Sequence, residues 1–289
     1  AYASLDAMLA DVDVVDICTP THLHHEQVLA AAAAGKDIVC EKPIARTLEQ
    51  AQGMIHACER AGVKLLVAHV VRFFPEYAQA KAAVDRGEIG QVAAVRLARE
   101  AFQPKKAANN WFVDFRKSGG MMLDLMIHDL DYARWVAGEV ESVFAKSIST
   151  SHPGAGVDHG LAILTHRSGA ISHVTGSWAY PPPEFHTSFE IAGAQGLTEF
   201  SSDRSAPISL HLHKEEGGEA PDVPLPGSPL SESPYTTQMK EFYDALAHDT
   251  PVRVSAVDGL AALQIALAAV ESARSGVAVA LEPLQEVSR

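Results

Sequence analysis

The sequence predicts an α/β protein in which a small parallel sheet is followed by a larger, mostly antiparallel sheet. In the first third of the chain, short apolar runs alternate with helix-like segments at the spacing of βαβ units. After Gly90 the chain carries a series of runs in which apolar and polar residues alternate, which is typical of half-buried antiparallel strands. We therefore expect two domains, residues 1–88 and 89–289.

The first part has the start and stop signals of βαβ units. Gly35 and Gly62 each follow a helix-like stretch, and glycine readily adopts the left-handed conformation that ends a helix. Thr47 is a candidate N-cap for the second long helix. Strands and helices in this order form a parallel sheet with helices on its faces. The predicted strands are 12–19, 37–40 and 64–70, and the predicted helices are 5–9, 26–34 and 47–60.

The second part opens with a long strand and one helix, and then becomes a sheet of alternating strands. A segment rich in Gly, Pro, Ser and Glu, residues 214–234, reads as a loop, and two helices close the chain. The predicted strands are 91–102, 140–150, 157–165, 170–178, 187–191, 197–200 and 208–213, and the predicted helices are 121–136, 235–248 and 257–275.

Composition excludes several classes of protein. The chain has 289 residues, 47% of them hydrophobic, and a formal net charge of −13. An acidic chain lacks the basic surface that binds nucleic acid or anionic lipid. No apolar run approaches the ~20 residues of a membrane span, and no signal segment is apparent. Cys18, Cys40 and Cys58 form no close pair, so we expect reduced thiols, buried at Cys18 and Cys40, and a cytoplasmic location.

Glu41-Lys42-Pro43 directly follows a short apolar run and is the first candidate for chemistry. A lysine at the end of a parallel strand places a compact positive charge where it can stabilise a developing alkoxide. The alternative is a surface lysine that pairs with Glu41.

Asp124, His128 and Asp131 supply the second candidate. Their spacing of i, i+4 and i+7 places them on one face of the predicted helix. Histidine, with an ordinary pKa of ~6.5, suits a general base near neutrality. Asp124 would orient the reacting group, and Asp131 would orient or cap. The alternatives are an exposed polar helix face or a metal site, but a metal would need a third ligand.

Two further sets of residues are candidates for binding. Thr19, Pro20 and Thr21 follow the first strand, with Thr21 as a possible N-cap, and the nearby histidines fit a strand–helix junction better than a zinc site. A substrate cleft could be lined by Arg72, Trp111 and Tyr180, although core packing suits the two aromatic residues better.

Taken in order, these motifs resemble the glucose–fructose oxidoreductase, inositol dehydrogenase and rhizopine catabolism family (Gfo/Idh/MocA). The resemblance covers essentially the whole chain. It rests on Thr19-Pro20-Thr21-His22-Leu23-His24, on residues 33–43 ending in Glu41-Lys42-Pro43, on His69-Val70-Val71-Arg72-Phe73, on Asp124-x-x-x-His128-x-x-Asp131, and on residues 258–276.

The resemblance implies a Rossmann domain followed by an α+β domain with a large open sheet, and an NAD or NADP cofactor without a metal. It implies oxidation or reduction of sugars, inositols or related polyols. Three sets of residues carry these roles. The resemblance makes Lys42, Asp124 and His128 catalytic; it makes Thr19, Pro20, Thr21, His24, Glu41 and Lys42 cofactor-binding; and it makes Lys42, Arg72, Asp124 and His128 substrate-binding.

One family feature is missing from these 289 residues, namely a Gly-x-Gly-x-x-Gly turn after a strand. The chain begins with Ala1, and we expect that the first strands of the Rossmann domain precede it. Pyrophosphate binding and the choice between NAD and NADP therefore cannot be assigned to these residues.

The sequence thus predicts an NAD(P)-dependent oxidoreductase acting on a secondary alcohol of a sugar or cyclitol. By the family layout it would form a homodimer or homotetramer through the open sheet face, without nucleic-acid or membrane partners. The alternatives are a non-catalytic sugar- or nucleotide-sensing or structural relative of the same fold, and a reductase of a biliverdin-like or imine substrate.

Overall fold

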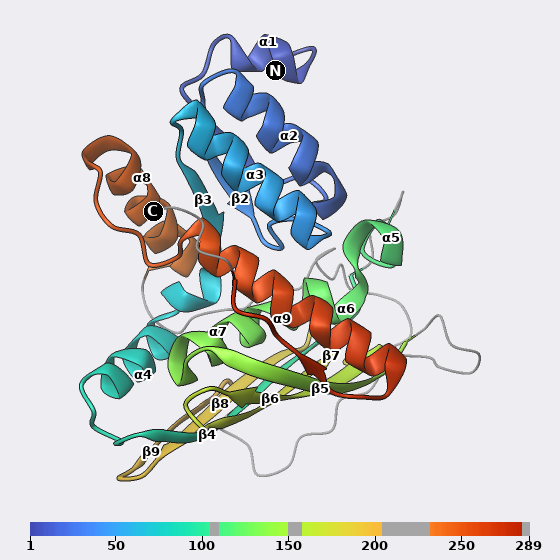
Figure 1. The fold of residues 1–289 in the computed structure, drawn as a ribbon, viewed down its shortest axis with the longest axis vertical. Coiled ribbons are helices and arrows are strands. Elements are labelled where there is room, and N and C mark those ends of the chain that lie inside the picture. The colour runs from blue at the N-terminus through green and yellow to red at the C-terminus, as the bar shows by residue number, and fades with distance from the viewer. Residues whose placement is uncertain (105–109, 150–157, 204–231, 285–289) are drawn as a thin grey trace.

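The computed structural model describes residues 1–104, 110–149, 158–203 and 232–284. It has the two expected sheets, which confirms the predicted fold class (Figure 1). The predicted strand 208–213 and most of the predicted loop 214–234 lie outside the described residues. The small sheet is parallel in the order β1-β2-β3, with β1 (Val14–Ile17), β2 (Asp37–Glu41) and β3 (Leu65–Ala68), and its helices are α1 (Leu5–Leu9), α2 (Thr21–Ala33) and α3 (Leu48–Ala61).

The large sheet has the order β10-β5-β6-β7-β4-β8-β9. Only the β4–β7 pair is parallel within the described sheet. Its strands are β4 (Val92–Ala101), β5 (Val140–Ile148), β6 (His159–His166), β7 (Ile171–Ser177), β8 (Phe185–Gly193), β9 (Leu197–Ser201) and β10 (Val279–Ala280).

Helix α3 forms as local rules dictate. The Thr47 side chain accepts a hydrogen bond from the Gln50 N–H, and Gly62 is left-handed with a φ of 67°. Both caps confirm the sequence prediction. Helix α2 starts earlier than predicted, because Pro20 takes the N-cap position and Thr21 lies inside the first turn. The expected N-cap role of Thr21 is therefore wrong.

Two long helices cover one face of the large sheet (Figure 1). They are α7 (Ile127–Ala137) and α9 (Ala256–Ser275). Helix α9 also reaches the small sheet, where a Cβ atom added to Gly259 would lie 2.9 Å from Val67 Cγ1. Only glycine permits this contact between α9 and β3, so α9 joins the two parts of the chain. Contrary to expectation, α9 is long and apolar enough for a membrane span, but most of that stretch is buried within the protein.

The predicted helix 121–136 is divided into two. Helix α6 (Gly120–Asp124) ends before Leu125, and α7 begins at Ile127. Met126 between them packs on β7 so closely that a Cβ atom on Gly176 would lie 2.2 Å from Met126 Cγ. Asp124 and His128 therefore come from two consecutive helices and not from one helix face, which corrects the prediction.

The remaining elements include several that the sequence did not indicate. These elements are the 3-10 turn η1 (Val70–Phe73), α4 (Pro75–Asp85), α5 (Phe115–Ser118) and β10. Helix α8 (Pro234–His248) completes the last helix pair.

The three cysteines are all free. Cys18 is exposed, which corrects its expected burial, whereas Cys40 and Cys58 are buried.

Candidate active site

Lys42 and Asp124 meet at the end of β2. The Lys42 Nζ atom donates a hydrogen bond of 2.6 Å to the Asp124 carbonyl oxygen and lies 3.5 Å from Asp124 Oδ1. The carbonyl is available because it belongs to the last residue of a helix. Both side chains keep a small exposed fraction, 14% and 11%. The partial burial strengthens the electrostatic interaction of the Lys42 charge, and the remaining exposure leaves the pair accessible to a small molecule.

His128 lies in the first turn of α7 and is partly buried. Burial holds its pKa well below the ordinary value, and the positive charges of Lys42 and Arg99 lower the pKa further. Its Nδ1 atom is buried and has no hydrogen-bond partner among the described residues. A lowered pKa favours the uncharged imidazole, which is the form that can accept a proton.

A buried ion pair that the sequence did not indicate holds α7 on the large sheet. Arg99 of β4 donates through Nε to Asp129 Oδ2 at 2.6 Å and through Nη2 to Oδ1 at 3.1 Å. Asp129 directly follows His128, so this bidentate pair fixes the turn that carries the histidine. The one sequence signal for this ion pair was that Arg99 occupies a core-facing position in the alternating pattern of β4.

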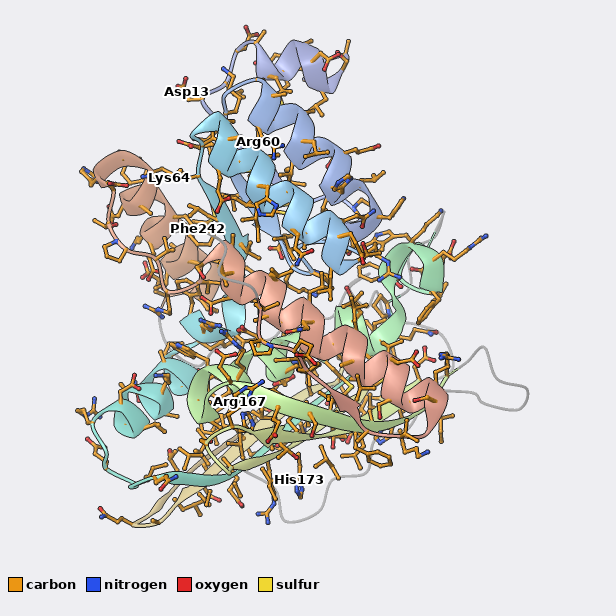
Figure 2. All side chains as sticks on the ribbon, in the orientation of Figure 1. Asp13, Arg60, Lys64, Arg167, His173 and Phe242 are labelled. Carbon is orange, nitrogen blue, oxygen red and sulfur yellow. The ribbon has the colours of Figure 1, made fainter. Side chains whose placement is uncertain are left out.

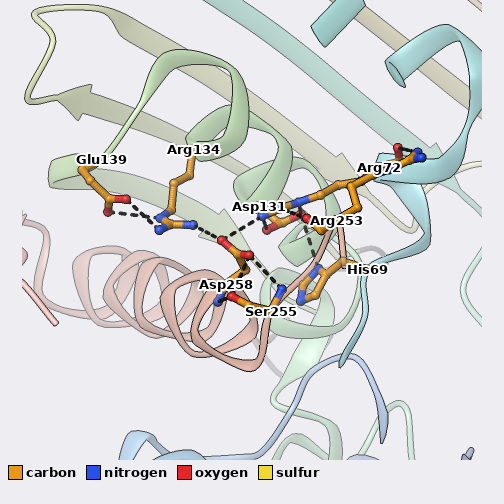
Figure 3. Close-up of polar contacts among 8 residues, drawn as sticks. All are labelled: His69, Arg72, Asp131, Arg134, Glu139, Arg253, Ser255 and Asp258. Carbon is orange, nitrogen blue, oxygen red and sulfur yellow. Dashed lines mark hydrogen bonds and ion pairs between the residues drawn. The ribbon is translucent and has the colours of Figure 1, made fainter. Parts of the chain in front are cut away.

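Arg72 is bonded to protein groups instead of facing a cleft (Figure 3). It is 1% exposed, and its Nη2 and Nε atoms bind the Asp131 carboxylate at 2.6 and 2.8 Å. Its Nη1 atom donates to the Arg253 carbonyl oxygen at 3.0 Å. Among the described residues, the hydrogen bonds and ion pairs of Arg72 are with Asp131, Asp258 and Arg253, and its predicted substrate contact stays a prediction. Asp131 orients Arg72 within this network.

His69, which follows β3, was also missed by sequence reasoning. It is fully buried, and its Nδ1 atom lies 3.7 Å from Asp131 Oδ2. Neither ring nitrogen has a hydrogen-bond partner among the described residues. Burial is the main cause that lowers its pKa. The positive charges of Arg72 and Lys42 also lower the His69 pKa, whereas Asp131 raises it.

The predicted cofactor-binding residues lie at the carboxyl ends of β1 and β2, the edge at which α/β sheets bind ligands. His24 is 1% exposed, and its ring nitrogens lie 2.9 Å from the Thr19 and Pro43 carbonyl oxygens. It therefore ties the loop after β1 to the loop after β2. Thr19 Oγ1 donates to Gln27 Oε1 at 2.6 Å.

Several polar groups line this edge, where the sequence predicts cofactor binding. Pro20 provides no side-chain cap for α2, and its carbonyl oxygen accepts a hydrogen bond of 2.8 Å from the Leu23 N–H. The Nδ1 atom of His22 in the same turn is buried without a hydrogen-bond partner among the described residues. Glu41 Oε2 accepts from the Lys42 N–H at 3.1 Å, and burial raises the Glu41 pKa. Within the described part of the chain, no group of three or more His, Cys, Asp or Glu side chains could hold a metal ion.

The fold and site together define an oxidoreductase built on a Rossmann domain. Residues 1–69 match the family model described as "Oxidoreductase family, NAD-binding Rossmann fold", and residues 77–199 match the "GFO/IDH/MocA C-terminal domain". The chain belongs to the Gfo/Idh/MocA oxidoreductase family, which confirms the resemblance seen in its sequence.

Relatives and solved structures agree with this assignment. D-apiose dehydrogenase of Paraburkholderia graminis is 31% identical over 306 residues, which cover 98% of this chain and 77% of that protein. Myo-inositol 2-dehydrogenase of Thermotoga maritima is 30% identical over 290 residues, covering 98% and 84%. The structure of GenD2 from gentamicin A biosynthesis in complex with NAD has a TM-score of 0.83 at 25% identity, covering 98% and 82%. Levoglucosan dehydrogenase in complex with NADH and levoglucosan has a TM-score of 0.78 at 27% identity, covering 96% and 83%.

Proposed function

We propose that this chain forms the active site of an enzyme that transfers hydride between NAD or NADP and a secondary alcohol or ketone of a sugar, an inositol or a related polyol. The observation that carries the proposal is the contact between Lys42 and Asp124, close enough to His128 for the Lys42 charge to lower the pKa of that histidine. The names of the relatives support the substrate class, since they include inositol, apiose and levoglucosan dehydrogenases.

In the oxidation direction, His128 accepts the hydroxyl proton of the substrate. The Lys42 ammonium stabilises the negative charge that develops on the oxygen, and Asp124 holds that ammonium in place. The cofactor, when bound, would supply the acceptor for the hydride that leaves the alcohol carbon. The products would be a ketone, an imidazolium that holds the proton, and a reduced nicotinamide that holds the electron pair of the hydride.

Three segments would hold the nicotinamide half of the cofactor. Thr19, Pro20 and Thr21 follow β1, Glu41 and Lys42 end β2, and His24 fastens the two loops from behind. No Gly-x-Gly-x-x-Gly turn occurs in these residues, so they do not distinguish NAD from NADP.

The test is an assay of the full-length protein with inositols, aldoses and anhydrosugars in the presence of each oxidised cofactor. We expect at least one cyclitol or sugar to reduce NAD or NADP, and we expect Lys42→Met to abolish most of that turnover. Reduction of a biliverdin-like or imine substrate, with no polyol oxidised, would contradict the proposal. So would ligand binding without any turnover, which is the result expected of a sensing protein.

We further propose that the enzyme forms a homodimer or homotetramer through the face of the large sheet that none of the described helices covers. Leu161 and Ile171 are 42% and 45% exposed on that face, and Figure 2 shows His173 projecting from it away from the helices. Ile163 and Phe144 lie on the same face by the strand register. Apolar residues grouped in this way mark an interface.

Sedimentation of the full-length protein tests this arrangement. We expect a dimer or tetramer, and we expect Leu161→Asp to shift the mass toward the monomer. The matched control is Val277→Asp, which changes an exposed apolar residue after the end of α9. A monomeric parent protein, or a Leu161→Asp variant that keeps the mass of the parent, would contradict the proposed interface.

The three free cysteines support a cytoplasmic location, which we also propose. Recovery of the protein in a secreted or periplasmic cell fraction would contradict that location.

A further inference from the structure

Arg46 lies on the same loop as Lys42 and reaches the segment that leads to Asp124. Its Nη2 atom donates to the Phe115 carbonyl oxygen at 3.0 Å, and its Nε atom lies 3.4 Å from the Arg116 carbonyl oxygen. Both carbonyls belong to α5, and the Phe115 carbonyl also accepts a hydrogen bond of 2.9 Å from the Gly119 N–H. Arg46 therefore adds a second donor at Phe115 and binds a helix-end carbonyl at Arg116. The loop after β2 is therefore bonded to the large-sheet domain through both Lys42 and Arg46.

Gly119 makes room for the guanidinium. It ends α5 with a φ of 86°, and a Cβ atom at this position would lie 2.3 Å from Arg46 Nη1. The next residue begins α6, and α6 ends at Asp124. The guanidinium thus lies against the start of the short helix whose last residue contacts Lys42.

The Nη1 atom of Arg46 is buried without a hydrogen-bond partner among the described residues, which is unfavourable for the free energy of folding. Burial also lowers the pKa of Arg46. A side chain that served only to cover the surface would leave this atom in water, because an unbonded buried donor is unfavourable. The two bonds to α5 keep the guanidinium in place nonetheless.

We propose that Arg46 is a positioning residue that fixes the loop of Lys42 relative to helix α6, and so holds the Lys42 ammonium on Asp124. This inference rests on the function proposed above. The packing of α9 on β3 and the Arg72–Asp131 ion pair join the two domains at a distance from Lys42. The Lys42 side chain is flexible, so its contacts with Asp124 do not by themselves fix the loop after β2 relative to α6. The second attachment through Arg46 supplies that restraint, and small errors in the position of catalytic groups reduce rates strongly.

A double-mutant cycle in the full-length protein tests this role. We expect Arg46→Ala to lower kcat at least ~10-fold, since misplacing a catalytic group by about 1 Å can cost ~10²-fold. The Kd of the dinucleotide, measured by quenching of protein fluorescence, should stay within about 2-fold, because Arg46 acts through Lys42 and Asp124 and not through cofactor binding. In the Lys42→Met background the same change should cause no further loss.

Two further variants complete the test. Arg46→Lys should recover part of the rate, because one ammonium can still donate to one carbonyl. Arg60→Ala, an exposed arginine at the end of α3, is the control and should leave kcat unchanged.

Two results would overturn the proposal. One is an unchanged kcat in Arg46→Ala. The other is a double variant whose loss equals the product of the two single losses, which is the behaviour of a general structural defect. If Arg46→Ala does not fold, the same cycle with Arg46→Lys decides by the same criterion. Normal turnover of Lys42→Met would instead contradict the proposed function, so the two failures are distinguishable.

Discussion

Replacing His128 with alanine is expected to lower kcat at least ~10²-fold, the scale of a lost general base. The reason is that the neutral imidazole is the group that takes the hydroxyl proton. Steady-state oxidation of the best polyol, followed by the absorbance of the reduced nicotinamide, measures the effect. His56→Ala is the matched control, because His56 is exposed on α3. A kcat within about 2-fold of the parent enzyme would remove His128 from the mechanism.

The pH dependence of the parent enzyme follows from the same residue. The base must be unprotonated, and burial together with the charges of Lys42 and Arg99 holds the His128 pKa well below 6.5. Activity in the oxidation direction is therefore retained through neutral pH and is lost only when the pH falls to the depressed pKa. A bell-shaped profile with its acidic limb above neutrality would contradict this assignment.

Replacing Lys42 with methionine is expected to lower kcat about 10²- to 10³-fold, the cost of removing one donor from an oxyanion site. Methionine keeps the unbranched apolar stem and removes the charge. Because Lys42 is one cause of the depressed His128 pKa, the acidic limb of the residual activity should move to higher pH. Lys36→Met, at the opposite end of β2, is the control. An unmoved acidic limb would show that the two groups do not interact.

Much of this site could be predicted because its residues follow strand ends. Lys42 and Thr19 come directly after apolar runs, and the carboxyl ends of parallel strands meet at one edge. The Gly35 and Gly62 signals then delimit the helices between those strands. Local patterns of this kind were enough for the small sheet, whereas the meeting of Lys42 with the segment of Asp124 was implied by the family resemblance.

The features that were missed depend on contacts between distant residues. The break between α6 and α7 is set by Met126 against Gly176, whereas the periodicity of residues 121–136 fits one helix equally well. Burial of His24 and Arg72 is likewise decided by their partners, the Pro43 carbonyl and the Asp131 carboxylate. From sequence alone, a polar residue in a motif cannot be assigned to a ligand or to a partner within the protein, because that partner comes from a distant segment.

A crystal structure of the full-length enzyme with an oxidised nicotinamide cofactor and its polyol substrate tests the central claim most directly. We expect the reacting oxygen to lie ~2.6–3.2 Å from both Lys42 Nζ and a ring nitrogen of His128, the reach of a hydrogen bond. A substrate oxygen that lies beyond this reach from either group, with the hydride-donating carbon still facing the nicotinamide, would contradict the account.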